Sequence, residues 1–443
     1  MINKFKKNHE IIKYFKNTSW MMGEKIIKII VLLIINVILA RYLGPKEFGF
    51  LSYVISLVSL FAIATHMGLS GLVVKELVSF KDNKDIILGT VFVIKWIGAL
   101  IGFSILLLIA FFTEELWSFN FWVLIIISCM IFFKPFEVID FWFNATVQAK
   151  YTAISNTIAI LLGLIIKILF IASGMGLLWI AFTYFIEAFF IAILFIYFYY
   201  KKDRMSIFSW SFSSVKAKEL LSRGWMIMLG SVFAIIYLKV DQVMLKWLVG
   251  DESVGIYAVA ASLSEAWYFV PTVIVASLFP KLIELKESNS MLYTKRLQQL
   301  FDFLLTLALI IAIIVTIISN DVIDILYGEE YKEAAIILSI HIWASLFIFM
   351  RAAFSKWIIM EDVLMFSLIT QGFGALTNII LNLVLIPYYD IYGAAIATFL
   401  SYAIASYFSL FAYKKTKPIF KMMTKSFFAP IRYILPTIRL IKK

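Results

Sequence analysis

Residues 86–112 read IILGTVFVIKWIGALIGFSILLLIAFF and contain one charged side chain, Lys95. The hydrocarbon core of a bilayer takes about 20 consecutive apolar residues in helical form, so this run is long enough to cross a membrane. About a dozen such runs follow one another along 443 residues, of which 63% are hydrophobic. Continuous runs of this length predict helices, because membrane β-barrels show short alternating segments. We therefore expect an all-α polytopic membrane protein.

The predicted spans are separated by loops of two kinds, very short ones and longer basic ones. We place the twelve spans at residues 20–42, 48–73, 86–112, 117–142, 150–172, 176–200, 222–248, 254–280, 296–319, 331–355, 363–386 and 391–413. Residues 1–19 are basic and lack the apolar core of a signal peptide, so we interpret them as a cytoplasmic N-terminal segment.

The basic residues fix the expected orientation. Of 40 Lys and Arg, about 30 lie in the two tails and in every second loop. The intervening loops hold only Arg41, Lys46 and Lys332. This is the positive-inside pattern, and it predicts that both termini lie in the cytoplasm. The net charge of +12 is then explained by anionic lipid headgroups, and a nucleic-acid partner is not expected.

Several classes of protein are disfavoured by what the sequence does not contain. The chain has one cysteine, Cys129, and three scattered histidines, which predicts neither a disulfide nor a metal site. It has no phosphate-binding loop of the Gly-x-x-x-x-Gly-Lys-Ser/Thr type. Its outward loops are too short to carry catalytic residues. We expect no cofactor and no enzyme activity.

The chain divides into two sets of six spans at a basic loop. RYLGPKEFGFLSYVISL (residues 41–57) aligns without gaps on WLVGDESVGIYAVAASL (residues 247–263), matching Gly44 to Gly250. Because six is even, both halves enter from the cytoplasm, which predicts a parallel repeat of the kind found in transporters. The expected domains are a cytoplasmic segment 1–19, a lobe 20–200, a cytoplasmic linker 201–221, a lobe 222–413 and a basic interfacial tail 414–443.

Glycine and proline mark where helices should end or bend. Gly44 and Gly250 are expected to end one helix in a left-handed cap before the next begins. Pro135 and Pro271 fall inside the fourth and eighth spans, where each removes a backbone hydrogen bond and should kink the helix, as a hinge or merely a bend.

Four segments carry a resemblance to a known family. They are ARYLGPKEFGFLSYVISLVSL (residues 40–60), HMGLSGLVVKEL (66–77), LKVDQVMLKWLVGDESVGIYAVAASLSE (238–265) and LNLVLIPYYDIYGAAIATFLSY (381–402). In this order and spacing, the chain resembles the bacterial polysaccharide flippases, such as O-antigen transporters. These share a superfamily with the MATE multidrug exporters and the lipid II flippases.

The resemblance implies two six-helix lobes around a central cavity in the bacterial cytoplasmic membrane. It implies a cargo of undecaprenyl-pyrophosphate-linked oligosaccharide, moved from the cytoplasmic to the outer leaflet for O-antigen or related surface polysaccharide synthesis. The partners to expect are membrane lipids, a proton or sodium ion, and other membrane proteins of polysaccharide assembly.

Lysines inside the spans are the candidate substrate ligands. Ionisable groups within spans are costly and usually face a cavity or a partner, and a lysine grips phosphate as a point charge. The alternative is a structural role. These lysines would then extend to the membrane interface or pair with a carboxylate on the same helix, as Lys28 could with Glu24 and Lys134 with Glu137. The candidates for a cationic cavity are Lys25, Lys28, Lys95, Lys134, Lys167 and Lys239.

Four deep acids or histidines are candidates for coupling transport to an ion gradient, because desolvation brings a carboxyl into the range where it titrates. They are Glu187, Asp241, Glu265 and His341. The alternative is a set of neutral or salt-paired structural groups.

Two rival functions stay open. A MATE-like exporter of cationic drugs would favour an acidic cavity, whereas lysines are in excess here. A membrane-embedded polymerase, ligase or glycosyltransferase would favour large outer loops or a soluble domain, and neither is present in the sequence.

Overall fold

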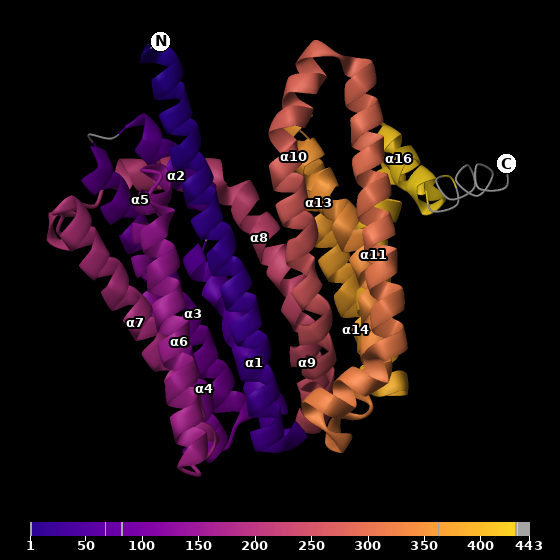
Figure 1. Cartoon of the computed structure of the whole chain (residues 1–443). Helices are drawn as coiled ribbons and strands as arrows, with labels where there is room; N and C mark the ends of the chain where they lie inside the picture. Colours follow the sequence, from indigo (N-terminus) through magenta and orange to yellow (C-terminus); the bar gives the residue numbers. More distant parts are fainter. Residues whose placement is uncertain (1, 67, 81–82, 362, 430–431, 433–443) are drawn as a thin grey trace. The chain divides into compact units, whose positions relative to one another are not determined.

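The computed structural model describes the chain except for residues 1, 67, 81–82, 362, 430–431 and 433–443 (Figure 1). In the described part, ten helices are long and apolar enough to cross a membrane, and no strand occurs. The all-α prediction is therefore confirmed. Most of the expected basic tail after residue 429 lies outside the described residues.

The chain forms two compact units, Met1–Val240 and Asp241–Lys443. The boundary falls inside one helix, so the first part of the predicted seventh span belongs to unit 1. The helices of unit 1 are α1 (Ile2–His66), α2 (Ser70–Ser79), α3 (Lys84–Thr113), α4 (Phe119–Ser128), η2 (Cys129–Glu137), α5 (Val138–Ala145), α6 (Ala149–Ala172), α7 (Leu177–Asp203), η3 (Ile207–Ser209) and most of α8 (Ser214–Leu248).

Unit 2 holds the remaining helices, and Figure 1 shows α10 and α11 joined at one end of it. They are α9 (Asp251–Glu265), η4 (Ala266–Tyr268), α10 (Phe269–Ser288), α11 (Ser290–Tyr327), η5 (Glu329–Tyr331), α12 (Ala334–His341), η6 (Ile342–Ala344), α13 (Ser345–Met360), α14 (Leu364–Ala403), η7 (Ile404–Phe408), α15 (Ser409–Ala412) and α16 (Lys417–Phe427).

Two of the long helices are each broken by one residue. α1 contains Gly44 with φ 69° and ψ 172°, and α14 contains Asp390 with φ 50° and ψ −133°. Both positions lie in loops that the sequence predicted between the first and second and between the eleventh and twelfth spans. Ten helices with two breaks accommodate the twelve spans expected.

The repeated glycines have the same kind of backbone. Gly250 has φ 136° and ψ −179°, and Gly44 resembles it in combining a positive φ with an extended ψ. The positive φ values agree with the expected left-handed cap, but the ψ values do not. The ψ values place both residues in the region that is essentially restricted to glycine, rather than in the left-handed helical region.

Both prolines predicted to kink their spans lie where the α-helix gives way to a 3₁₀ helix. Pro135 is inside η2, a 3₁₀ helix between α4 and α5. Pro271 lies in the first turn of α10, directly after the 3₁₀ turn η4. The last span has a further interruption that the sequence did not signal, the π-helix η7.

Unit 1 is held together by close helix contacts and by a fastened linker. A Cβ on Gly98 of α3 would lie 1.9 Å from the carbonyl oxygen of Ala64, and one on Gly102 would lie 2.8 Å from that of Phe61. These two glycines let α3 touch the backbone of α1. Beyond α7, Lys216 bonds the buried carboxylate of Glu76 at 2.5 Å, so the start of α8 is anchored to α2.

Candidate functional site

Unit 1 contains a carboxylate shared by two lysines. Glu137, at the end of η2, accepts a hydrogen bond from Lys134 Nζ at 3.1 Å through Oε1 and one from Lys95 Nζ at 3.1 Å through Oε2. Lys95 comes from α3 and is 1% exposed, while Lys134 is 29% exposed. Two lysines thus contact one carboxylate, and the carboxylates of Asp140 and Glu187 also interact electrostatically with Lys95 and Lys134, respectively.

Further contacts surround this group, which we call the Glu137 cluster (Lys95, Lys134, Glu137 and His66). His66 Nδ1 lies 3.8 Å from Glu137 Oε2, and the His66 side chain is 46% exposed. Lys95 Nζ also lies 5.1 Å from the centroid of the Phe141 ring. η2 is a 3₁₀ helix with three residues per turn, so Lys134 and Glu137, three residues apart, lie on the same face of it.

A third lysine of unit 1 forms an ion pair with a different carboxylate. Lys167 on α6 is 2% exposed and bonds Glu187 on α7 at 3.4 Å. Its Nζ also lies 4.3 Å from the centroid of the Tyr184 ring. The Glu187 carboxylate fits because Gly163 has no side chain: a Cβ there would lie 2.8 Å from Glu187 Oε2. This pair is neutral overall.

A small pocket connects Glu187 with α1. The pocket of about 30 Å³ is lined by Glu24, Lys28, Asn156 and Glu187, among others. Glu24 accepts a hydrogen bond from Asn156 Nδ2 at 3.1 Å, and it forms no ion pair with Lys28 in the part of the chain that the structure describes. Lys25 and Lys28 are both exposed on α1, and only Lys28 lines the pocket.

Unit 2 contains a buried carboxylate surrounded by neutral groups. Asp241, 3% exposed, lies near the end of α8. Its Oδ1 accepts a hydrogen bond from Asn382 Nδ2 at 2.5 Å, and its Oδ2 accepts one from Tyr257 OH at 2.9 Å and another from Thr398 Oγ1. Asn382 also donates to Asn378 Oδ1 at 3.2 Å. We call these five residues the Asp241 cluster.

The Asp241 cluster offers oxygen atoms for a small hard cation. It combines a carboxylate, two amide oxygens and two hydroxyls on side chains that are all buried. Among the described residues, Asn382 Oδ1 has no hydrogen-bond donor. Buried polar groups are normally satisfied, so an unused acceptor beside a carboxylate suits a proton or a cation with oxygen ligands.

Three further residues predicted for the site, His341, Glu265 and Lys239, belong to neither cluster. His341, 2% exposed at the end of α12, packs edge-on against Tyr257 with ring centroids 5.9 Å apart. Glu265 ends α9 at the 3₁₀ turn η4 and is half-buried, as is Lys239 on α8. The structure thus brings Asp241 and His341 together through Tyr257.

Sequence reasoning missed the neutral members of the Asp241 cluster and one arginine. Asn378 and Asn382 stand four residues apart in an apolar span, and polar residues one turn apart share a helix face. That spacing was the available signal. Arg351 on α13 donates to the Ala405 carbonyl oxygen in η7 at 3.2 Å and to Ser367 Oγ at 3.3 Å, which supplies a donor where the π-helix exposes its backbone.

The sequence of the chain matches a known protein family and a curated protein. Residues 14–286 match the sequence profile of a family described as polysaccharide biosynthesis protein. The chain is similar to the probable flippase AglR of Haloferax volcanii, with 28% identity over 187 residues, which is 40% of this chain and 38% of that protein. The chain therefore matches well under half the length of this curated relative.

Solved structures share the fold over nearly the whole chain. A lipid II flippase MurJ in an inward closed conformation superposes with a TM-score of 0.71 at 15% identity, covering 95% of this chain and 93% of that one. An inward-facing multidrug resistance MATE family transporter of the MOP superfamily superposes with a TM-score of 0.62 at 13% identity, covering 89% and 95%. At these identities the likeness establishes the fold.

Proposed function

The chain belongs to the polysaccharide biosynthesis protein family, and from this premise we propose that it is a flippase for a lipid-linked oligosaccharide. The proposed cargo is an undecaprenyl-pyrophosphate-linked repeat unit, moved from the cytoplasmic to the outer leaflet of a bacterial cytoplasmic membrane. The product would serve O-antigen or related surface polysaccharide synthesis. The fold and the naming of its relatives as flippases and transporters support a transporter rather than an enzyme.

The observation that carries the proposal is the pair of lysines that share the carboxylate of Glu137, one of them partly exposed. A pyrophosphate must cross a medium of low dielectric constant, where an isolated anion is very costly. Two lysines contact one carboxylate, and Lys134 is 29% exposed whereas Lys95 is 1% exposed, so Lys134 is the ammonium that a phosphate can reach. A single ammonium attracts phosphate without the fixed bidentate geometry of arginine, which suits a ligand that must also leave.

The test is a flipping assay with the purified chain in liposomes containing a lipid-linked oligosaccharide. Lys134→Gln is expected to lower the flipping rate at least tenfold with normal protein abundance, Lys134→Arg to retain part of it, and Lys134→Glu to abolish it by repelling phosphate. Lys46→Gln is the matched control, because Lys46 is exposed on α1 outside the cluster. Wild-type flipping by Lys134→Gln and Lys134→Glu would refute the proposal.

We further propose that the Asp241 cluster couples flipping to a proton or sodium gradient. Its carboxylate is held by neutral hydrogen-bond donors, so binding one proton or one cation would neutralise it. Asp241→Asn is expected to abolish the dependence of flipping on the gradient, while Glu284→Gln, whose side chain is 63% exposed, leaves it intact. Equal gradient dependence in both variants would show that Asp241 is structural. Glu187, Glu265 and His341 would then remain for the same assay.

Export of small cationic molecules is the second candidate, because the MATE fold is shared. A cationic substrate is favoured by acidic ligands, whereas the buried ionisable groups of unit 1 include Lys95 and Lys167. Efflux of a cationic dye from the same liposomes, with no movement of the lipid-linked oligosaccharide, would favour the exporter.

A further inference from the structure

The helix α16 has two chemically different faces. Ile419, Met423 and Ser426 are buried, and they follow each other at intervals of four and three residues. Lys417, Lys421 and Lys425 are exposed and follow each other at intervals of four. Both spacings place their members on one side of a helix, so α16 presents a basic stripe on the side away from its packed face.

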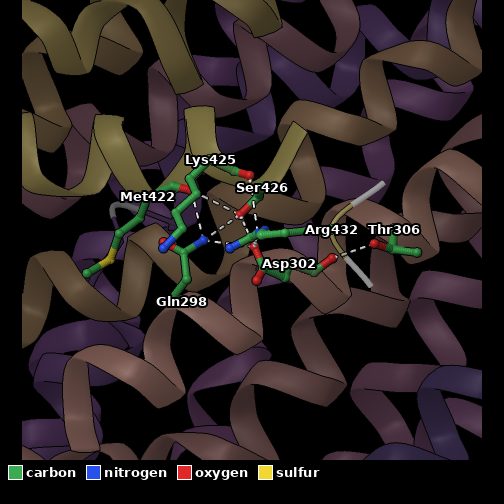
Figure 2. Close-up of polar contacts among 7 residues, drawn as sticks. All are labelled: Gln298, Asp302, Thr306, Met422, Lys425, Ser426 and Arg432. Atoms are coloured by element: carbon green, nitrogen blue, oxygen red, sulfur yellow. Dashed lines mark hydrogen bonds and ion pairs between the residues drawn. The ribbon is translucent and has the colours of Figure 1, made fainter. Parts of the chain in front are cut away.

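A buried carboxylate fixes this end of the chain to α11. Asp302 Oδ1 accepts hydrogen bonds from Gln298 Nε2 at 2.8 Å, from Ser426 Oγ at 2.8 Å and from Arg432 at 2.9 Å. Gln298 also donates to the Met422 carbonyl oxygen at 3.1 Å. Figure 2 shows these side chains converging on Asp302. The relation between α11 and α16 is thereby set by directional bonds as well as by packing.

A cavity of about 650 Å³ with several polar side chains in its lining lies beside this network. Its lining includes Ser290, Thr294, Lys295, Lys425 and Arg432. The charge of Asp302 is matched by Arg432, whereas Lys295 and Lys425 are exposed and have no ion-pair partner among the residues that the structure describes. The cavity thus carries an excess of about two positive charges, together with hydroxyl donors, which is the chemistry of a phosphate site.

The surroundings of the cavity indicate a lipid rather than a phosphate in water. Met291, in the cavity lining, is 85% exposed, and Phe428, just beyond α16, is 61% exposed. On the neighbouring flank of α11 lies an apolar groove of about 450 Å³ whose lining includes Leu282, Leu300 and Phe303. Apolar side chains beside a basic rim are the arrangement of a surface at the level of lipid headgroups.

We propose that the cavity between α11 and α16 binds the headgroup of an anionic phospholipid of the cytoplasmic leaflet. Lys295 and Lys425 contact the phosphodiester, Ser290 and Thr294 donate hydrogen bonds to it, and an acyl chain lies along the apolar groove. The bound lipid holds α16 at the membrane surface, and Asp302 positions the helix for it. The basic loops at this end place it on the cytoplasmic side by the positive-inside rule.

The test measures binding of phosphatidylglycerol to the delipidated full-length chain in neutral detergent by native mass spectrometry. Lys295→Gln and Lys425→Gln are each expected to weaken binding roughly fivefold, and the double variant on the order of twentyfold, given the attraction of one basic side chain to an anionic lipid. The Lys417→Gln/Lys421→Gln double variant loses the same charge from α16 outside the cavity and is expected to bind within about twofold of the parent.

Equal weakening by both double variants would overturn the proposal, because the binding would then be a diffuse attraction to α16. Competition separates the two sources of phosphate. Glycerol phosphate at millimolar concentration should leave the phosphatidylglycerol adduct in place, and phosphatidylcholine should not compete. Full displacement by glycerol phosphate would refute the lipid and identify a soluble ligand.

Discussion

The paired carboxylates Glu137 and Glu187 of unit 1 and the carboxylate of Asp241 in unit 2 are held in opposite ways. In unit 1, lysines lie against carboxylates: Lys95 and Lys134 share Glu137, and Lys167 pairs with Glu187. In unit 2, the carboxylate of Asp241 is bonded by an amide and two hydroxyls. Glu137 and Glu187 are therefore held by opposite charges, while the charge of Asp241 is solvated by neutral dipoles.

The two arrangements differ in what a change of charge does to the stability of the protein. An ion pair that loses one member leaves an uncompensated charge, which costs about 3–5 kcal/mol when buried. A carboxylate among neutral donors can gain a proton or a cation without leaving any partner charge behind. We infer that the ion pairs of Glu137 and Glu187 are costly to change, whereas the charge of Asp241 can change during transport.

Glu137→Gln should have the largest effect on stability, because two lysines lose their shared carboxylate at once. We expect the free energy of unfolding to fall by about 4 kcal/mol, with much lower abundance in the membrane. Thermal unfolding in detergent, followed by tryptophan fluorescence, measures it. A parent-like melting temperature would mean that Lys95 and Lys134 reach other partners or water.

Lys167→Met should destabilise the chain by about 3 kcal/mol, since Glu187 would lose the partner that balances its charge. The second-site variant Lys167→Met/Glu187→Leu should recover most of the loss, because apolar residues of similar size replace a buried pair at little cost. The same melting experiment applies. If the double variant is no more stable than Lys167→Met, the pair is not the source of the effect.

Asp241→Asn should change stability by no more than about 1 kcal/mol, because no cation loses its partner. Its effect should be on the response to a cation: added sodium should raise the melting temperature of the parent and leave that of the variant unchanged. A loss of stability as large as that of Lys167→Met would contradict the contrast between the two units.

Lys25→Gln and Lys28→Gln should have the smallest effects, within about 0.5 kcal/mol, since both side chains are exposed. The two variants should differ in their flipping rates. Lys28 lines the pocket with Glu187, so its variant should flip more slowly, whereas Lys25→Gln should match the parent. Equal flipping rates for the two would remove Lys28 from the candidate site.

The sequence was sufficient for what depends on local pattern. Apolar runs predicted the membrane helices, and Gly44, Pro135 and Pro271 predicted where they break. The pairing of Lys134 with Glu137 followed from a spacing of three residues on a helix. Such features need only neighbours along the chain, which a sequence displays directly.

The sequence was insufficient for contacts between helices. Lys95 and Glu137 are 42 residues apart, and Lys167 and Glu187 are 20 apart, so neither pairing follows from helical spacing. Glu187 had no same-helix cation one turn away, yet a lysine of α6 reaches it. Neutral amides do not change net charge and so carry little signal in a sequence, although Asn382 bonds to Asp241 and Asn378 accepts a hydrogen bond from Asn382.

The backbone contact at Gly98 has a consequence for biogenesis. The second half of α1 and the whole of α3 are each apolar enough to leave the translocon separately, and only afterwards can their backbones meet at Gly98 and Gly102. A side chain at Gly98 would leave membrane insertion intact and block this later association. The resulting chain would be integrated yet unassembled, and quality-control proteases of the membrane would act on it before any transport could be measured.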